Sequence, residues 1–204
     1  MNTRQSAAGE RRIPNALTIA GVDPSGGAGI LADVKAMSAL GAYGCAVIAA
    51  LTAQNTQGVT GISPVPPDFV GLQIDTLFTD VRIDAVKIGM LGQKPVIQVV
   101  AEKLAKWAPA HVVLDPVMVA KSGDLLLERE AVGAMREAML PQATLLTPNL
   151  PEAGVLLEER PVETVKEMRR VAERLRNKMA HSGQRWVMVL SLIHISEPTR
   201  QEAI

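Results

Sequence analysis

Short apolar runs alternate along the chain with segments in which apolar residues recur every three or four positions. Leu17–Gly21 is the first apolar run, and it ends at the turn-forming sequence Asp23–Gly27. From Gly29 the apolar period lengthens to three or four, which predicts a helix, and Cys45–Thr52 is apolar at nearly every position, which predicts a second buried strand. Further strands are predicted at 85–89, 111–115, 144–147 and 186–190, and further helices at 67–79, 94–107, 128–140, 151–157 and 162–181. Repeated strand–helix units predict an α/β fold with a mostly parallel central sheet and helices on both faces.

Composition and charge are those of a globular protein without a general affinity for polyanions. The 204 residues are 48% hydrophobic and 21% charged, which suits one domain with a full-sized core. Basic and acidic residues both number 21 and aromatics make up 2%, so neither nucleic acid nor a membrane is an expected partner. Segment 1–14 is expected to be a flexible leader rather than a secretory signal, which favours a cytoplasmic location. The single cysteine, Cys45, is expected to be a small buried side chain rather than a reactive thiol.

A glycine-rich turn, Gly21–Gly29, separates the first strand from the first helix. Glycine permits close approach of the backbone to a ligand, and the N-terminus of the following helix favours anions. The sequence matches neither the Walker pattern nor the dinucleotide fingerprint. By its residues alone, the turn is either a simple strand-to-helix connection or part of a ligand site.

Six blocks of the chain resemble, in the same order, blocks of the hydroxymethylpyrimidine/phosphomethylpyrimidine kinase family of thiamine biosynthesis. They are ALTIAGVDPSGGAG (16–29), LGAYG (40–44), TAQNTQGV (52–59), VRIDAVKIGML (81–91), VLDPVMVAKSG (113–123) and LLTPNLPE (145–152). The resemblance implies a ribokinase-like three-layer α/β/α sandwich over residues 15–189. It also implies MgATP-dependent phosphorylation of 4-amino-5-hydroxymethyl-2-methylpyrimidine and of its monophosphate.

The resemblance further implies a set of residues that bind the pyrimidine. These are Gly21, Ala28, Asp33, Gln54, Met90 and Val117. Gln54 carries a donor and an acceptor that suit an aminopyrimidine edge, and Met90 offers a soft apolar contact to a flat ring. Asp33 is expected on the first turn of the helix, where its carboxylate could accept from a ligand hydroxyl or amine. Taken one by one, a strand-end glutamine is more often a solvated cap and a methionine more often core.

Three further polar residues follow predicted strands at the edge where open α/β sheets bind ligands. Asp115 ends one strand, and Asn149 and Glu152 follow the next. The resemblance implies that Asn149 and Glu152 contact ATP and that Asp115 and Glu152 organise Mg²⁺. The alternative is structural, with Asp115 capping a turn and Glu152 favouring a helix N-terminus.

The last residues depart from the kinase pattern. Leu190–Arg200 resembles the translation of a transposase adapter used in DNA-sequencing libraries, so 190–204 is expected to be a non-native tail. In the family, the catalytic loop and most of the ATP-binding surface lie beyond this point, so no catalytic residue is assigned. The chain is therefore expected to be incomplete at the C-terminus, poorly soluble and inactive in phosphorylation.

Two other functions remain open at this level. A pyridoxal-type vitamin kinase shares similar glycine-rich starts, although Gln54 and Asn55 favour the aminopyrimidine. A non-catalytic pyrimidine-binding module is the other alternative. A homodimer of the full-length parent is also left open.

Overall fold

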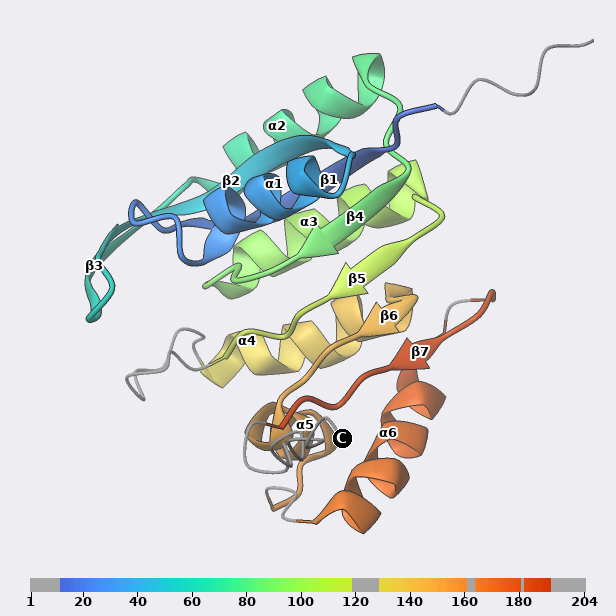
Figure 1. Ribbon diagram of the computed structural model, residues 1–204. Helices are drawn as coiled ribbons and strands as arrows, with labels where there is room; N and C mark the ends of the chain where they lie inside the picture. Colours follow the sequence, from blue (N-terminus) through green and yellow to red (C-terminus); the bar gives the residue numbers. More distant parts are fainter. Residues whose placement is uncertain (1–11, 119–128, 161–163, 181, 192–204) are drawn as a thin grey trace, which may run out of the picture.

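The computed structural model describes residues 12–118, 129–160, 164–180 and 182–191. Seven strands form one sheet in the order β3-β2-β1-β4-β5-β6-β7 (Figure 1). The strands are β1 (Asn15–Val22), β2 (Tyr43–Gln54), β3 (Val59–Pro64), β4 (Ala85–Ile88), β5 (Val112–Leu114), β6 (Leu145–Leu146) and β7 (Trp186–Val187). Every neighbouring pair is parallel except β2 and β3. The predicted α/β fold with a mostly parallel sheet is therefore confirmed.

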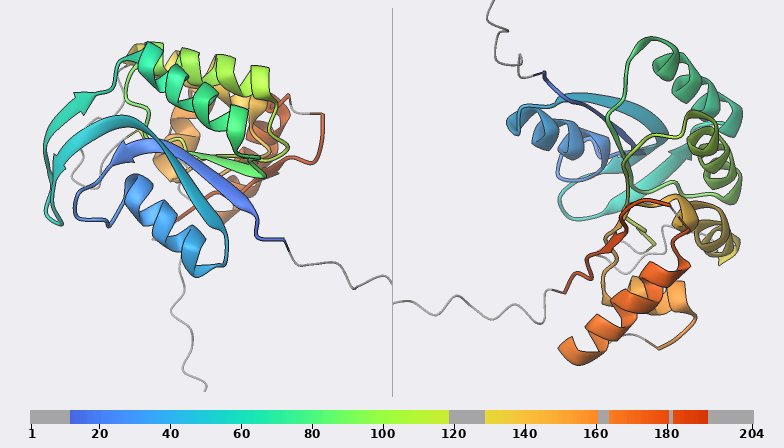
Figure 2. Two further views of the ribbon diagram at one scale, coloured as in Figure 1. Left: turned by 90° about the horizontal axis from the view of Figure 1, so that it is seen from above. Right: turned by 90° about the vertical axis from the view of Figure 1, so that its right-hand side faces the viewer.

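Helices cover the sheet from both sides. They are α1 (Gly29–Ala39), α2 (Pro67–Asp80), α3 (Lys94–Trp107), α4 (Arg129–Ala134), α5 (Leu150–Leu157) and α6 (Val165–Lys178). Figure 2 shows α1 on one face of the sheet and α2 and α3 on the other. The main core lies beneath α2 and α3, where Leu17 and Ile19 of β1 and Ile88 of β4 are fully buried. Because side chains alternate along a strand, Thr18 and Lys87 lie on the opposite face, beside α1.

Strand β3 is a feature that the sequence analysis missed. It pairs antiparallel with the end of β2 and forms a hairpin that projects beyond the rest of the sheet (Figure 1). Its sequence, VTGISP, contains glycine and proline and is mostly exposed, so it lacks the apolar run by which the buried strands were recognised. Pairing with β2 rather than intrinsic preference holds this segment in strand conformation.

Several element boundaries differ from the prediction. The helix predicted at 128–140 ends its α-helical part at Ala134 and continues as a π-turn to Met139 and a 3-10 turn at 140–142. Pro141 explains the end, because proline cannot donate the next helical hydrogen bond. The helix predicted at 162–181 spans Val165–Lys178 and begins with a capping box between Thr164 and Glu167. Residues 128, 162, 163 and 181 lie outside the described residues, as do 1–11 and 192–204 of the predicted leader and tail.

The last strand, β7, is shorter than the predicted 186–190, although backbone hydrogen bonds continue past it. The amide of Leu190 donates to the carbonyl of Pro148 over 2.8 Å. Val187 and Val189 pack against the core, whereas Trp186 and Met188 are 63% and 54% exposed. An apolar strand of this kind is usually buried on both faces. In β7 and the residues after it, the face with Val187 and Val189 is packed and the face with Trp186 and Met188 is exposed. Among the described residues, no helix is both long and apolar enough to cross a membrane.

Candidate pyrimidine site

The buried carboxylate of Asp23 organises the glycine-rich turn. Asp23 is 4% exposed and accepts from the Ser25 amide at 2.8 Å, the Ser25 hydroxyl at 2.7 Å, the Gly27 amide at 3.1 Å and the Ala28 amide at 2.9 Å. Burial alone would raise the pKa of Asp23, but these hydrogen bonds outweigh it and hold the pKa below its ordinary value. The amides of Gly27 and Ala28, just before α1, are therefore already bound to Asp23. Amides at this position of a helix are the ones that commonly bind a ligand anion. From the sequence, Asp23 was predicted only to form a turn, and no local pattern indicated that its carboxylate accepts from the turn amides.

Two glycines bring the turn against β1. Gly29 has φ of +58°, and a Cβ on it would lie 2.3 Å from the carbonyl oxygen of Gly21. Gly21 donates its amide to the carbonyl of Met90 over 3.1 Å, and a Cβ on Gly21 would lie 2.4 Å from the Cε of Met90. The approach at Gly29 requires glycine, because a side chain there would push the turn away from the backbone of β1. At Gly21 the contact is with the flexible end of Met90, which would have to move to admit a side chain.

A pocket of about 480 Å³ opens beside this turn. Its walls are the glycine-rich turn, the ends of β2 and β3 with the loop between them, and single residues that follow β4 and β5. Five of the six residues predicted for the pyrimidine pocket line it, namely Gly21, Ala28, Gln54, Met90 and Val117. The structure adds Thr52, Ile62 and the loop 55–58, among others. Its volume is within the range of small-molecule sites.

Gln54 is placed at the end of β2 by two local hydrogen-bond systems. The Thr52 hydroxyl donates to the carbonyl of Val22 over 2.7 Å and lies 3.2 Å from the Oε1 of Gln54. The Oδ1 of Asn55 accepts from the amides of Gln57 and Gly58 at 2.8 and 3.1 Å, which closes the β2–β3 turn. Within the described part of the chain, the Nε2 of Gln54 has no hydrogen-bond acceptor, so it is available to a ligand in the pocket.

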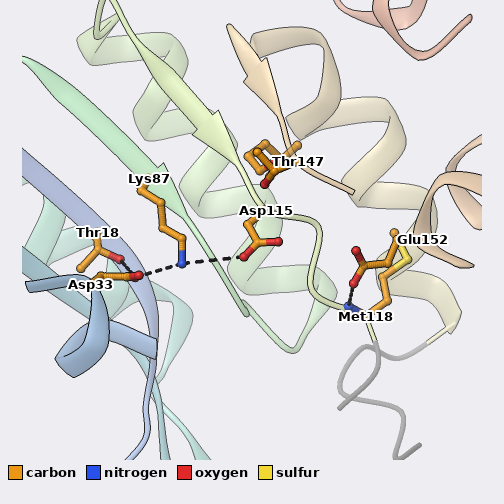
Figure 3. Close-up of polar contacts among 8 residues, drawn as sticks. Thr18, Asp33, Lys87, Asp115, Met118, Thr147 and Glu152 are labelled. Atoms are coloured by element: carbon orange, nitrogen blue, oxygen red, sulfur yellow. Dashed lines mark hydrogen bonds and ion pairs between the residues drawn. The ribbon is translucent and has the colours of Figure 1, made fainter. Parts of the chain in front are cut away.

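Asp33, the sixth predicted residue, does not line this pocket. The helix begins at Gly29, as predicted, and this start places Asp33 on the second turn of α1 rather than on the first. Its Oδ2 accepts from the Thr18 hydroxyl at 2.6 Å and from the Nζ of Lys87 at 2.9 Å (Figure 3). The carboxylate is therefore bound by the sheet.

Asp115 and Glu152 lie near each other at the carboxyl ends of β5 and β6, outside the pocket (Figure 3). Glu152 is 5% exposed, and its oxygens accept from the amides of Asn149 at 2.9 Å and Met118 at 3.4 Å. Asn149 completes a capping box on α5 by accepting from the amide of Glu152 at 2.9 Å. Glu152 therefore stabilises the start of α5, which is the structural role that the sequence offered as an alternative to ligand binding.

Burial governs the acidity of both carboxyl groups. It raises the pKa of Asp115, while the ammonium of Lys87, 3.9 Å away, acts to lower it and the charge of Asp33 to raise it. Burial also raises the pKa of Glu152, and the two amide donors partly offset this effect. Cys45 is buried in β2 as predicted, and burial raises the pKa of its thiol. It lies in the core beneath the sheet and not in the pocket.

Comparison with known proteins gives this arrangement a family. The sequence pattern of the phosphomethylpyrimidine kinase family matches residues 23–201 of the chain. The chain belongs to this family. The match extends into 190–204, so the interpretation of that segment as an adapter-derived tail stays a prediction.

The chain is also similar in sequence or structure to individual kinases. The chain is 58% identical over 154 residues to the hydroxymethylpyrimidine/phosphomethylpyrimidine kinase of Escherichia coli, a match covering 76% of this chain and 58% of the relative. It is similar to the crystal structure of phosphomethylpyrimidine kinase from Clostridium difficile, with a TM-score of 0.77 and 42% identity over 81% of this chain and 71% of that one. An ADP complex of Bacillus subtilis pyridoxal kinase is similar with a TM-score of 0.76 and 34% identity, over 83% of this chain and 64% of that one. The chain thus spans 58% of the length of the Escherichia coli relative.

Proposed function

We propose that this chain forms the pyrimidine-binding part of a kinase that phosphorylates 4-amino-5-hydroxymethyl-2-methylpyrimidine and its monophosphate with ATP. The observation that carries the proposal is the convergence of Gly21, Ala28, Gln54, Met90 and Val117 on one pocket, from the glycine-rich turn and from the ends of β2, β4 and β5. Membership of the family supports it. The whole reaction belongs to the proposal because the chain spans only part of the relatives' length.

The pocket residues suit a flat aminopyrimidine. Gln54 would donate from its Nε2 and accept at its Oε1, a pattern that pairs with a ring nitrogen and an exocyclic amine. The thioether of Met90 would pack on the ring face, with Val117 excluding water from the side near β5. Val117 follows Asp115 by two residues, so one wall of the pocket lies next to the carboxyl end of β5, where the hydroxymethyl group would have to be presented for phosphoryl transfer.

The residues at that edge fit magnesium held through phosphates and water. Among the described residues, no group of three or more His, Cys, Asp or Glu could form a metal cage of its own. Mg²⁺ commonly takes only one or two carboxylates, and Asp115 and Glu152 would supply them. The ion would neutralise charge on the transferred phosphoryl group. Asn149 would contact ATP beside Glu152 while keeping its place in the capping box.

A binding assay with two ligands tests the proposal. Isothermal titration of the purified chain with the aminopyrimidine alcohol should give saturable binding at one site, and pyridoxal should bind at least tenfold more weakly. The reverse preference would assign the chain to the pyridoxal kinases instead. Equal and negligible heats for both ligands would contradict a pyrimidine site in this chain.

Replacing Gln54 by leucine should weaken pyrimidine binding by about 10- to 30-fold, because two hydrogen bonds to the ring edge are lost. Gln98→Leu is the matched control, since Gln98 is exposed on α3 and away from the pocket. This control should bind as the unchanged chain does. Equal affinity of the Gln54 and Gln98 variants would remove Gln54 from the site.

A turnover assay tests the sequence-based prediction that this chain is inactive in phosphorylation. Incubation with MgATP and the alcohol should yield no phosphorylated pyrimidine, whereas the Escherichia coli relative under the same conditions serves as the positive control. Sustained product formation by this chain would overturn the prediction. A cytoplasmic location and a homodimeric full-length parent stay predictions as well.

A further inference from the structure

A chain of polar contacts joins three strands and one helix on the α1 side of the sheet. The Oδ2 of Asp33 accepts from Thr18 on β1 at 2.6 Å and from the Nζ of Lys87 on β4 at 2.9 Å. The same ammonium lies 3.9 Å from the Oδ2 of Asp115, which follows β5. Figure 3 shows Lys87 between the two carboxylates. No sequence pattern singled out Lys87 or Thr18.

The backbone places this contact chain where it is. Thr18 and Lys87 are direct partners across β1 and β4, so their side chains stand side by side on one face of the sheet. Two residues further on, a Cβ on Gly89 would lie 3.0 Å from the Nζ of Lys87 and 3.0 Å from the Cβ of Ala20. The absence of a side chain at Gly89 leaves room for the ammonium at the carboxyl end of β4.

Asp33 connects this contact chain to the pocket through α1. The turn that precedes α1 supplies pocket wall at Gly27 and Ala28, and the helix itself begins at Gly29, which also lines the pocket. From the same helix, the Nζ of Lys35 donates to the carbonyl of Gly26 at 2.5 Å. A shift of α1 along the sheet would therefore move the pocket wall. Through Asp33, α1 is hydrogen-bonded to both β1 and β4, and these bonds oppose such a shift.

We infer that Lys87 is a positioning residue for the site: it fixes α1 and its pocket wall through Asp33 and links them to the Asp115 edge. The inference rests on the proposed pyrimidine function. It assigns Asp33 an indirect role, in which its carboxylate meets Thr18 and Lys87 rather than the ring. With side-chain exposures of 19% and 23%, the Asp33–Lys87 pair is shielded enough for its loss to leave a poorly solvated charge.

The first test measures pyrimidine affinity by titration of the full chain. Lys87→Met should weaken binding about tenfold, and Lys87→Arg, which keeps the charge, should remain within about threefold of the unchanged chain. Lys103→Met is the matched control, because Lys103 has the same side-chain exposure of 23% and is paired with Asp75 between α2 and α3. The Lys103→Met variant should have a lower melting temperature and an unchanged affinity for the pyrimidine. A merely structural role for Lys87 predicts the same result for both methionine variants.

A double-mutant cycle separates positioning from direct contact. Asp33→Asn should weaken binding as Lys87→Met does, and the double variant should bind no more weakly than the weaker single variant. Additive losses would mean that Asp33 touches the ligand independently of Lys87. That outcome, or wild-type affinity in Lys87→Met, would overturn the inference.

Amide hydrogen exchange without ligand gives a readout that does not depend on the proposed function. Exchange over residues 25–30 should rise about tenfold in Lys87→Met and stay unchanged in Lys103→Met. If the unchanged chain fails to bind the pyrimidine, the proposed function fails, and this comparison still decides whether Lys87 holds α1. Equal exchange in the two variants would show that it does not.

Discussion

Replacing Gly29 by alanine should abolish measurable pyrimidine binding, with a loss of at least 100-fold. Two effects act together. The φ of +58° is costly for any residue with a side chain, by about 1–2 kcal/mol. The new Cβ would also meet the carbonyl oxygen of Gly21 at 2.3 Å. Because that oxygen belongs to the backbone of β1, the clash cannot be relieved by a rotamer change, and the turn itself must move at a cost of about 1–3 kcal/mol.

Gly41 offers a matched control for this prediction. It also has positive φ, +82°, but a Cβ there would have nothing within 4 Å. Gly41→Ala should therefore lower the free energy of unfolding only by the cost of placing a side chain at positive φ, and it should leave pyrimidine affinity intact. Titration calorimetry and urea denaturation of both variants measure the two effects separately. Binding by Gly29→Ala at near-normal affinity would contradict the placement of the turn against β1.

Replacing Asp23 by asparagine should loosen the glycine-rich turn and lower the free energy of unfolding by about 3 kcal/mol. The carboxylate accepts from the amides of Ser25, Gly27 and Ala28 and from the Ser25 hydroxyl. An asparagine can present one acceptor oxygen, so its NH₂ group would face donors that are left without a partner. Since Gly27 and Ala28 form pocket wall, pyrimidine affinity should fall about 30- to 100-fold with the loss of order.

Asp68→Asn is the control for the loss of a negative charge at a helix start. Asp68 lies exposed in the first turn of α2, so its replacement should cost about 0.5 kcal/mol and no affinity. A comparable loss in both variants would mean that Asp23 acts only through the helix dipole. Urea denaturation at neutral pH provides the comparison.

The acidity of Asp23 predicts the pH range in which its contribution disappears. Its native pKa lies below the ordinary value of 3.8, so the folded state binds its proton less readily than the unfolded state. The contribution is complete above about pH 4 to 5 and is lost as the pH falls through the native pKa. The difference in unfolding free energy between the unchanged chain and Asp23→Asn should therefore be constant near neutrality and shrink below pH 4. A difference that grows on acidification would contradict the hydrogen-bonded, ionised carboxylate.

Prediction from the sequence worked where one local signal was sufficient. The strands at Leu17–Gly21 and Cys45–Thr52 are recognisable because almost every residue in them is apolar. Leu17–Gly21 is buried on both faces, whereas Leu51 of the second strand is 52% exposed. The helix at Lys94–Trp107 was predicted with its observed bounds, since its apolar face follows the helical period. Strand β3 failed for the opposite reason, because its conformation depends on a partner strand rather than on its own residues.

The candidate site shows the same division. Resemblance of motifs named Gly21, Ala28, Gln54, Met90 and Val117, and the fold brings all five to one pocket. It also named Asp33, whose carboxylate the fold directs to Thr18 and Lys87 instead. The motif alone could not distinguish a residue that touches a ligand from one that holds the helix beside it.

By itself, the sequence determined the alternation of most strands and helices, the family, and five of the residues that surround the pocket. These are properties of local periodicity and of short motifs. Only the tertiary structure decided that Asp23 binds the turn amides and that Lys87 lies between Asp33 and Asp115. Both results depend on groups far apart in the chain, or on backbone directions within a turn. A buried charge acquires its role from the partners that replace water around it. For Asp23 these are amides that the fold of the turn directs toward it, and for Lys87 they are carboxylates brought together when β4, β5 and α1 pack.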